Sequence, residues 1–186
     1  VAIAATIKMP EKEIVRNKAP LSLDRFILTR ALLQGGNLGC FAFSYGVVST
    51  YLAIYGKEEL GIVGGSGLFF ALLSVGLICS RLVGSRSLRE GKITRNACLG
   101  ALISLFGYLC FAAFHNPFGY YACALIVGLG NGHMYPAFQT MFINLAEHSQ
   151  RGTANSTMLV SWDVGVGLGI VVGGALAEYW GYGAAF

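Results

Sequence analysis

Five long apolar stretches, separated by short polar segments, constrain the fold of this chain more than any other feature. Each stretch has roughly 18–27 residues, and about 20 helical residues are enough to cross the ~30 Å hydrocarbon core of a bilayer. Strands are disfavoured, because the stretches are too long and lack a two-residue alternation. The sequence therefore predicts an all-α, polytopic transmembrane helix bundle with spans at about residues 31–55, 63–83, 97–114, 119–145 and 156–180.

The composition supports a membrane protein. Of the 186 residues, 55% are hydrophobic, 12% are charged and 26 are glycine. An ordinary soluble domain has about 25% charged residues and about 7% glycine, so a soluble fold of this size is excluded. All five cysteines lie in apolar stretches without a CxxC pair, which favours small packed side chains over disulfides or metal ligands. We expect no metal site and no cofactor.

The N-terminal 30 residues differ from the rest of the chain. Residues 1–7 are apolar and resemble the end of a preceding transmembrane helix. Residues 8–30 hold six Lys or Arg and three acidic residues, which is typical of a polar linker. We therefore expect a linker at 8–30, a transmembrane bundle at 31–186, and a fragment of a longer protein.

The basic residues are distributed unequally between the two sides of the predicted bundle. If the five spans alternate in direction, Lys57 alone of the 13 Lys and Arg residues falls on one side. Cytoplasmic segments carry an excess of Lys and Arg, so the other side is predicted to be cytoplasmic. That side contains the linker, the 84–92 loop and the 146–155 connection.

The 84–92 loop reads Gly-Ser-Arg-Ser-Leu-Arg-Glu-Gly-Lys. It resembles the G-x-x-x-D-R-x-G-R/K signature of the major facilitator superfamily, and the chain departs from that signature at Leu88, where the family has the Asp of a conformation-dependent salt bridge. The residues that match the signature are Gly84, Arg89, Gly91 and Lys92. The resemblance implies that these four residues help to set the balance between inward- and outward-open states.

Three further segments and one residue pair carry the same resemblance. They are Ser80-Arg81, Gly128–Gly132 with Pro136, Arg151–Ala154, and Asp163–Gly169. The resemblance implies half of a transporter that packs two six-helix halves around a midplane cavity and alternates between inward- and outward-open states. The chain would contain the end of helix 6, the inter-half linker and helices 7 to 11. The implied partners are an N-terminal six-helix half of the same protein, a small-molecule substrate and the lipid of a bacterial cytoplasmic (inner) membrane.

Polar and aromatic residues share one face of the predicted 31–55 helix. The residues on this face are Gln34, Asn37, Phe41 and Tyr45, together with Ser44 and Ser49. Polar groups facing lipid without partners cost several kcal/mol, so this face does not contact hydrocarbon. It either lines a substrate cavity or forms hydrogen bonds with neighbouring helices.

The predicted 119–145 helix has a comparable face with Asn131, Tyr135 and Gln139. We expect this face to line the cavity. His133 falls on the other side of the helix, and Pro136 permits a local distortion because it removes one backbone hydrogen bond. Histidine is the side chain that titrates nearest neutral pH, so His133 is either a proton carrier or a packed, hydrogen-bonded residue.

Asp163 is the most informative single residue of the predicted 156–180 helix. A carboxylate at membrane depth costs roughly 2.5–3.5 kcal/mol on insertion scales, so its presence indicates a partner or a role in transport. Proton coupling, substrate contact and a structural bond remain alternatives. Gly165, Gly169 and Gly173 recur every four residues on the opposite face, which predicts a close helix-packing contact.

These observations favour a secondary active transporter that moves a small solute by alternating access, with His133 and Asp163 as proton-coupling candidates. A channel-like or noncatalytic membrane subunit is the first alternative. An embedded enzyme is less favoured, because the three histidines lie too far apart to share a metal and no phosphate-binding loop is present. Nucleic-acid binding is not expected, because the basic cluster lies between membrane spans and lacks interleaved aromatic residues.

Overall fold

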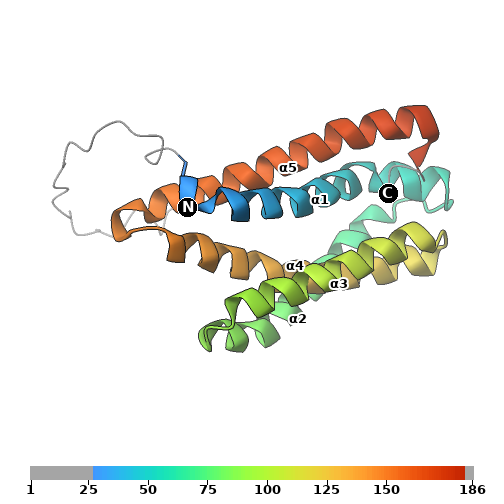
Figure 1. Cartoon of the computed structure of the whole chain (residues 1–186). Helices are drawn as coiled ribbons and strands as arrows, with labels where there is room; N and C mark the ends of the chain where they lie inside the picture. The colour runs from blue at the N-terminus through green and yellow to red at the C-terminus, as the bar shows by residue number, and fades with distance from the viewer. Residues whose placement is uncertain (1–26, 183–186) are drawn as a thin grey trace, which may run out of the picture.

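The computed structural model describes residues 27–182, and within this range it is helical without strands (Figure 1). The described helices are η3 (Thr29–Ala31), α1 (Leu32–Glu58), α2 (Ser66–Arg89), α3 (Ile93–Ala113), α4 (Pro117–Leu145), η4 (His148–Gln150) and α5 (Arg151–Trp180). The predicted helix end at 1–7 and residues 8–26 of the predicted linker lie outside the described residues.

The five long helices alternate in direction, so the described chain has two distinct ends (Figure 1). The starts of α1, α3 and α5 and the ends of α2 and α4 lie together at one end. We call this the basic end, because it carries Arg30, Arg81, Arg86, Arg89, Lys92, Arg95 and Arg151. The opposite end carries Lys57 beside Glu58 and Glu59.

Glycine lets α1 and α5 pack backbone against backbone. A Cβ atom on Gly46 would lie 2.5 Å from the carbonyl oxygen of Val166. Cβ atoms on Gly165 and Gly169 would collide with the carbonyl oxygens of Gly39 and Phe43. The predicted contact along Gly165, Gly169 and Gly173 is therefore confirmed, and it is formed with α1.

The central helix of the bundle is α4, which packs against α2 and α3 along its length and also contacts α1 and α5. Its approach to α2 again uses glycine, because a Cβ on Gly76 would lie 2.5 Å from the carbonyl oxygen of Leu125. At the basic end, Met134, Phe138 and Phe142 of α4 are buried against Leu38 of α1 and Met158 of α5. A second cluster joins α1, α2, α3 and α4 at the opposite end around Phe69, Phe111 and Tyr120.

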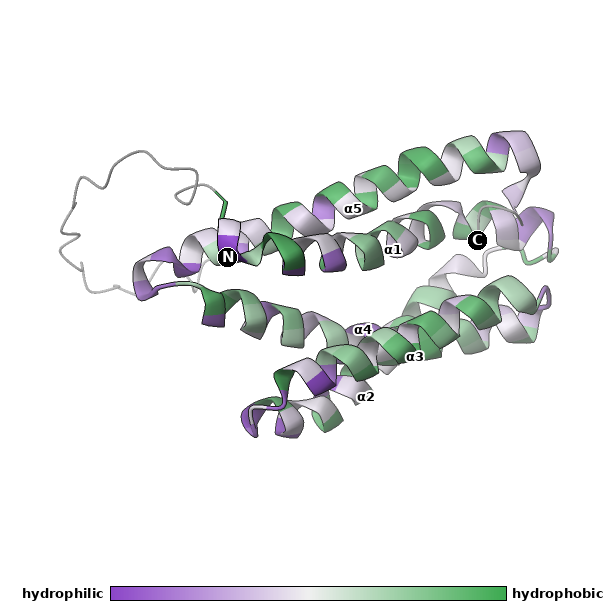
Figure 2. Ribbon diagram, in the orientation of Figure 1, coloured by the Kyte–Doolittle hydropathy of each residue, from purple (hydrophilic) through white to green (hydrophobic). Residues whose placement is uncertain are grey.

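The outer surfaces of the helices are apolar, and the polar residues concentrate at the two ends (Figure 2). By length and composition, four described stretches could cross a membrane: Thr29–Glu58, Ser66–Arg89, Ile93–Ala113 and His148–Trp180. The 29-residue α4 is not among these four. Asn131, His133 and Gln139 lie along α4, the helix that is covered by the others.

The predicted 84–92 and 146–155 loops are shorter in the structure than expected. Helix α2 continues to Arg89, so only residues 90–92 connect it to α3. Gly91 adopts φ 76°, a left-handed conformation that glycine tolerates and that reverses the chain there. Similarly, η4 and the start of α5 at Arg151 occupy most of 146–155. These segments are polar enough to resemble loops, but Ser, Arg and Leu are compatible with a helix.

Candidate functional site

Three of the predicted cavity residues lie together at the basic end. Gln34, Asn37 and Phe41 of α1 line a cleft of about 520 Å³ whose other walls belong to α3 and α4. Thr94 and Asn144 add polar groups to these walls. We call this space the α1–α3–α4 cleft.

Gln34 is the least satisfied residue of this cleft. Its Oε1 atom is buried and accepts no hydrogen bond from any described residue. A buried acceptor without a donor costs about 1–3 kcal/mol, so native proteins retain few of them. The cleft therefore favours a ligand or a further segment that donates a hydrogen bond to Gln34.

Tyr135 and Gln139 line a different cleft of about 290 Å³ between α2 and α4. We call it the α2–α4 cleft. Arg81 and Ser85 of α2 face the same space, and Pro136 forms part of its α4 wall. A guanidinium, a phenol and a carboxamide thus converge at the basic end, where they could bind a polar or anionic group.

An aromatic chain connects α1, α5 and α4. The rings of Tyr45 and Trp162 have centroids 5.5 Å apart, and those of Trp162 and Tyr135 are 5.8 Å apart in an edge-to-face arrangement. Sequence reasoning did not single out Trp162, because one more aromatic residue in an apolar stretch carries no signal of its own. Its position directly before Asp163 was the available signal.

Asn131 lies away from both clefts. Only 8% of the residue is exposed, and its Oδ1 accepts a hydrogen bond of 3.2 Å from Ser104 Oγ of α3. Asn131 was expected to line the cavity. In the structure it lines neither cleft and forms a hydrogen bond between α3 and α4. The seven predicted cavity residues are therefore divided between the α1–α3–α4 cleft, the α2–α4 cleft, the aromatic chain and the α3–α4 contact.

Asp163 is exposed on α5 and forms no hydrogen bond or ion pair with another described residue. Its neighbour Trp162 is half-buried against Tyr45 and Tyr135. Asp163 thus follows a residue of the aromatic chain in sequence, while its own side chain lies on a surface that the described helices leave open.

His133 lies in a third groove, separate from Tyr135 and Gln139. Its Nδ1 atom is 3.1 Å from the carbonyl oxygen of Leu129, and its own carbonyl oxygen accepts a 3.0 Å hydrogen bond from Asn96 Nδ2. The groove lies between the end of α2 and the start of α3 and is about 290 Å³ in volume. His133 is therefore held in a fixed orientation at the basic end.

The four signature residues surround the short α2–α3 connection. Gly84 is buried in α2, where an added Cβ would lie 3.3 Å from the His133 ring. Lys92 Nζ lies 2.8 Å from Glu90 Oε2, whereas Arg89 is exposed and has no ion pair with a described residue. Leu88, which stands where the signature has Asp, lines the α2–α4 cleft. The carboxylate that pairs with cations at this connection is that of Glu90, two residues later.

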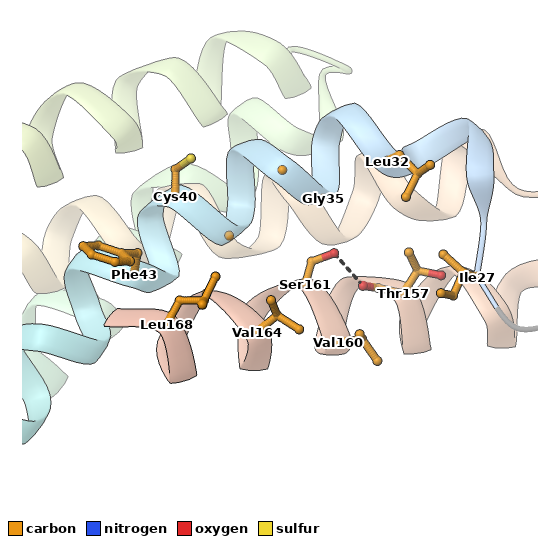
Figure 3. A pocket seen from close by; sticks show the side chains of 13 residues that line it. Ile27, Leu32, Gly35, Cys40, Phe43, Thr157, Val160, Ser161, Val164 and Leu168 are labelled. Carbon is orange, nitrogen blue, oxygen red and sulfur yellow. Dashed lines mark hydrogen bonds between the residues drawn. The ribbon is translucent and has the colours of Figure 1, made fainter. Parts of the chain in front are cut away.

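A groove of about 590 Å³ lies between α1 and α5 and is almost wholly apolar (Figure 3). The hydroxyls of Thr157 and Ser161 lie there, but they donate to the carbonyls of Thr153 and Thr157 at 2.7 and 2.8 Å. Leu32 and Val160 are exposed along its rim. This groove suits contact with lipid or another helix, because it has no free polar group that would orient a polar solute.

No group of three or more His, Cys, Asp or Glu residues that could hold a metal ion occurs within residues 27–182. The chemistry that the described clefts provide is therefore hydrogen bonding, aromatic stacking and charge.

Comparison with known proteins assigns the chain to a family. The Major Facilitator Superfamily matches it over residues 5–146 and again over residues 94–186. These matches cover most of the chain, and the chain belongs to this family of membrane transporters. The resemblance based on the 84–92 segment is confirmed, as is the all-α fold expected for half of such a bundle.

Similar curated proteins cover nearly all of this chain. An uncharacterized MFS-type transporter of Pseudomonas aeruginosa is 25% identical over 167 residues, which are 86% of this chain and 39% of the relative. Multidrug resistance protein fnx1 of Schizosaccharomyces pombe is 26% identical over 174 residues, 94% of this chain and 32% of the relative. An uncharacterized MFS-type transporter of Salmonella typhimurium is 23% identical over 170 residues. The chain thus spans about two fifths or less of the relatives it matches.

Proposed function

We propose that this chain forms the second half of a secondary active transporter that moves a small solute by alternating access. An N-terminal six-helix half pairs with it, and the solute binds between the two halves. All five long helices, α4 included, span the membrane. Membership of the Major Facilitator Superfamily supports transport, and the described clefts supply the groups that would contact a solute.

The solute-facing surface comprises Tyr135, Gln139, Trp162 and Asp163, with Arg81 at its edge. The observation that supports this assignment is the edge-to-face contact between Trp162 and Tyr135, because Tyr135 lines the polar α2–α4 cleft and Trp162 directly precedes Asp163 in α5. An aromatic surface with a few polar groups and one carboxylate suits a small, amphipathic solute. Gln34, Asn37 and Phe41 form a separate polar cleft that opens when the basic end is accessible.

Asp163 carries the coupling proton. It has no partner among the described residues, and a charged carboxylate at membrane depth is costly unless water, a cation or a proton reaches it. His133 has a supporting position, since its ring is bonded to Leu129 and lies beside Gly84 of the signature. Protonation there would act on the α2–α3 connection and not on the solute directly.

The membrane is the bacterial cytoplasmic membrane, and the basic end faces the cytoplasm. The excess of Lys and Arg at that end supports this orientation. The linker and the connection of residues 90–92 are then cytoplasmic, and the 59–65 connection lies on the other side of the membrane.

Transport by the full-length protein in proteoliposomes tests the proposed function. Vesicles carrying an entrapped pH-sensitive dye receive an imposed pH gradient, and each compound of a panel of small metabolites and amphipathic drugs is added in turn. We expect at least one compound to accumulate against its gradient together with proton movement. An uncoupler should abolish the accumulation. If the compound instead moved only down its gradient, at channel-like rates that the uncoupler did not change, the proposal would be contradicted.

A further inference from the structure

The basic end contains a groove with more positive than negative charge. Its charged lining residues are three cations, Arg86, Lys92 and Arg95, and the single carboxylate of Glu90. The uncharged polar side chains of Ser87 and Asn96 and the ring of His133 complete the polar wall. The groove is about 290 Å³ in volume and lies between the end of α2 and the start of α3.

The ion pairs among the described residues of this groove leave an excess of positive charge. Glu90 is shared, because its carboxylate lies 3.4 Å from Arg86 Nε and 2.8 Å from Lys92 Nζ. Arg95 has no ion pair with a described residue, and it is exposed. One acidic residue thus serves two cations, and the third is available to an anion from outside the chain.

The wall towards the middle of the bundle is apolar. Val83 and Leu99 line the same groove and are 72% and 43% exposed. Further along the same helices, Leu82 and Leu102 are also exposed. Cations at the end of a membrane helix with bare aliphatic side chains beside them match the two parts of a phospholipid, an anionic headgroup and its acyl chains.

We propose that the groove between α2 and α3 binds an anionic glycerophospholipid. Its phosphate contacts Lys92 and Arg95, and its acyl chains cover Val83 and Leu99. Free phosphate would use the cations but not the aliphatic wall, and a nucleic acid would not reach a groove that continues into the apolar surface. His133, the second proton-coupling candidate, lines the same groove, but lipid binding is measured directly and needs no transport assay.

Lipid binding to the purified full-length protein in detergent tests the proposal. Native mass spectrometry counts bound dioleoyl phosphatidylglycerol, with zwitterionic dioleoyl phosphatidylcholine as the comparison lipid. We expect phosphatidylglycerol to bind more tightly, and Arg95→Gln to weaken it about fivefold, the effect of one basic residue near an anionic surface. The double variant Lys92→Gln/Arg95→Gln should weaken it by roughly 30-fold.

Two control variants distinguish binding in this groove from nonspecific electrostatic attraction of anionic lipid to the basic end. Arg151→Gln removes an exposed cation from the same end but outside the groove, and it should leave phosphatidylglycerol binding unchanged. Leu99→Ser should weaken phosphatidylglycerol binding, because it removes part of the aliphatic wall. The affinity of the protein for inorganic phosphate should stay unchanged, because the cations are kept.

Three outcomes would overturn the proposal. The first is equal affinity of the parent protein for the two lipids, which needs no variant. The second is equal loss in Arg95→Gln and Arg151→Gln. The third is complete displacement of the lipid by millimolar inorganic phosphate, which would identify a free-anion site.

Discussion

At the scale of single residues, Asp163 is the residue on which the proposed proton coupling depends. The residue is exposed and unpaired among residues 27–182, yet it lies well inside a 30-residue helix whose other exposed residues are mostly apolar. Helices that only hold a bundle together gain nothing from such a carboxylate. Its neighbour Trp162 connects it to Tyr45 and Tyr135 and thus to two other helices.

We predict that Asp163→Asn abolishes proton-coupled accumulation while membrane insertion remains intact. Asparagine has nearly the same size as aspartate but cannot exchange a proton, so solute binding can persist when coupling is lost. The measurement is uptake driven by an imposed pH gradient in proteoliposomes, together with the amount of inserted protein. Unchanged uptake with unchanged pH dependence would contradict the role of Asp163.

Trp162 provides the second test at this scale. We predict that Trp162→Ala reduces solute affinity and uptake more than Trp162→Phe does, because phenylalanine can still present a ring to Tyr135. The loss for alanine should be about five- to tenfold, the range expected for an aromatic contact worth about 1 kcal/mol or slightly more. The measurement is the concentration dependence of uptake. Equal activity of the two variants would show that the aromatic chain does not contact solute.

The residue-level predictions show what a helical face can and cannot specify. Spacing along α4 separated His133 from Tyr135 and Gln139, and the structure places them in different grooves. Spacing could not show that Ser104 of α3 would donate a hydrogen bond to Asn131, because the pattern of one helix does not indicate which other helix packs against it. The importance of Trp162 depends on ring contacts with two other helices, which no single-helix pattern contains.

At the scale of helices, glycine decides how closely two backbones approach. Gly169 of α5 is buried against the carbonyl of Phe43, whereas Gly167 on the same helix has no atom within 4 Å of an added Cβ. The four-residue repeat of Gly165, Gly169 and Gly173 was sufficient to predict a packing contact. It could not identify α1 as the partner, because the residues that receive the contact, Gly39, Phe43 and Val47, lie more than 100 residues earlier in the chain.

We predict opposite effects for two otherwise identical substitutions in α5. Gly169→Ala should destabilise the bundle by about 1–3 kcal/mol, because the methyl group forces α1 and α5 apart. Gly167→Ala should be neutral or stabilising by up to about 1 kcal/mol, because alanine favours a helix and meets no neighbour. Thermal unfolding midpoints of the purified protein in detergent provide the measurement. Equal midpoints for the two variants would contradict the packing described for α5.

Helix ends were the least predictable elements. The sequence-based ends of α2 followed polarity, and the structure extends this helix to Arg89. The polar turn Gly84–Arg89 remains helical because helix formation does not require an apolar side chain, and the stop comes from the left-handed Gly91. Where a membrane segment leaves lipid and where its helix ends are separate properties.

At the scale of the whole molecule, the two ends differ in charge. We predict that residues of opposite ends are accessible from opposite sides of the membrane. Val63→Cys and Ser149→Cys, each in a full-length background from which every native cysteine has been removed, are treated in cells with a membrane-impermeant maleimide. Val63→Cys should react in intact cells, and Ser149→Cys only after permeabilisation. Labelling of both positions from one side would refute the proposed topology.

The signature around the α2–α3 connection supports a prediction about the balance of states. Arg89 is exposed and has no ion pair with residues 27–182, so we propose that its charge contacts the N-terminal half. We predict that Arg89→Ala shifts the ratio of inward- to outward-open molecules by roughly two- to fivefold, as expected for one exposed charge. Accessibility of single cysteines placed on the two sides of the cavity measures this ratio. A ratio equal to that of the parent protein would contradict the prediction.

The three-residue connection between α2 and α3 has a mechanical consequence. Residues 90–92 hold the end of α2 close to the start of α3, and Glu90 pairs with Arg86 of α2 and with Lys92 of the connection itself. The turn thereby limits how far the two helix ends can separate. Leu88 lines the α2–α4 cleft and Glu90, two residues later, lines the groove proposed to bind lipid, so the two spaces share this one turn of the chain.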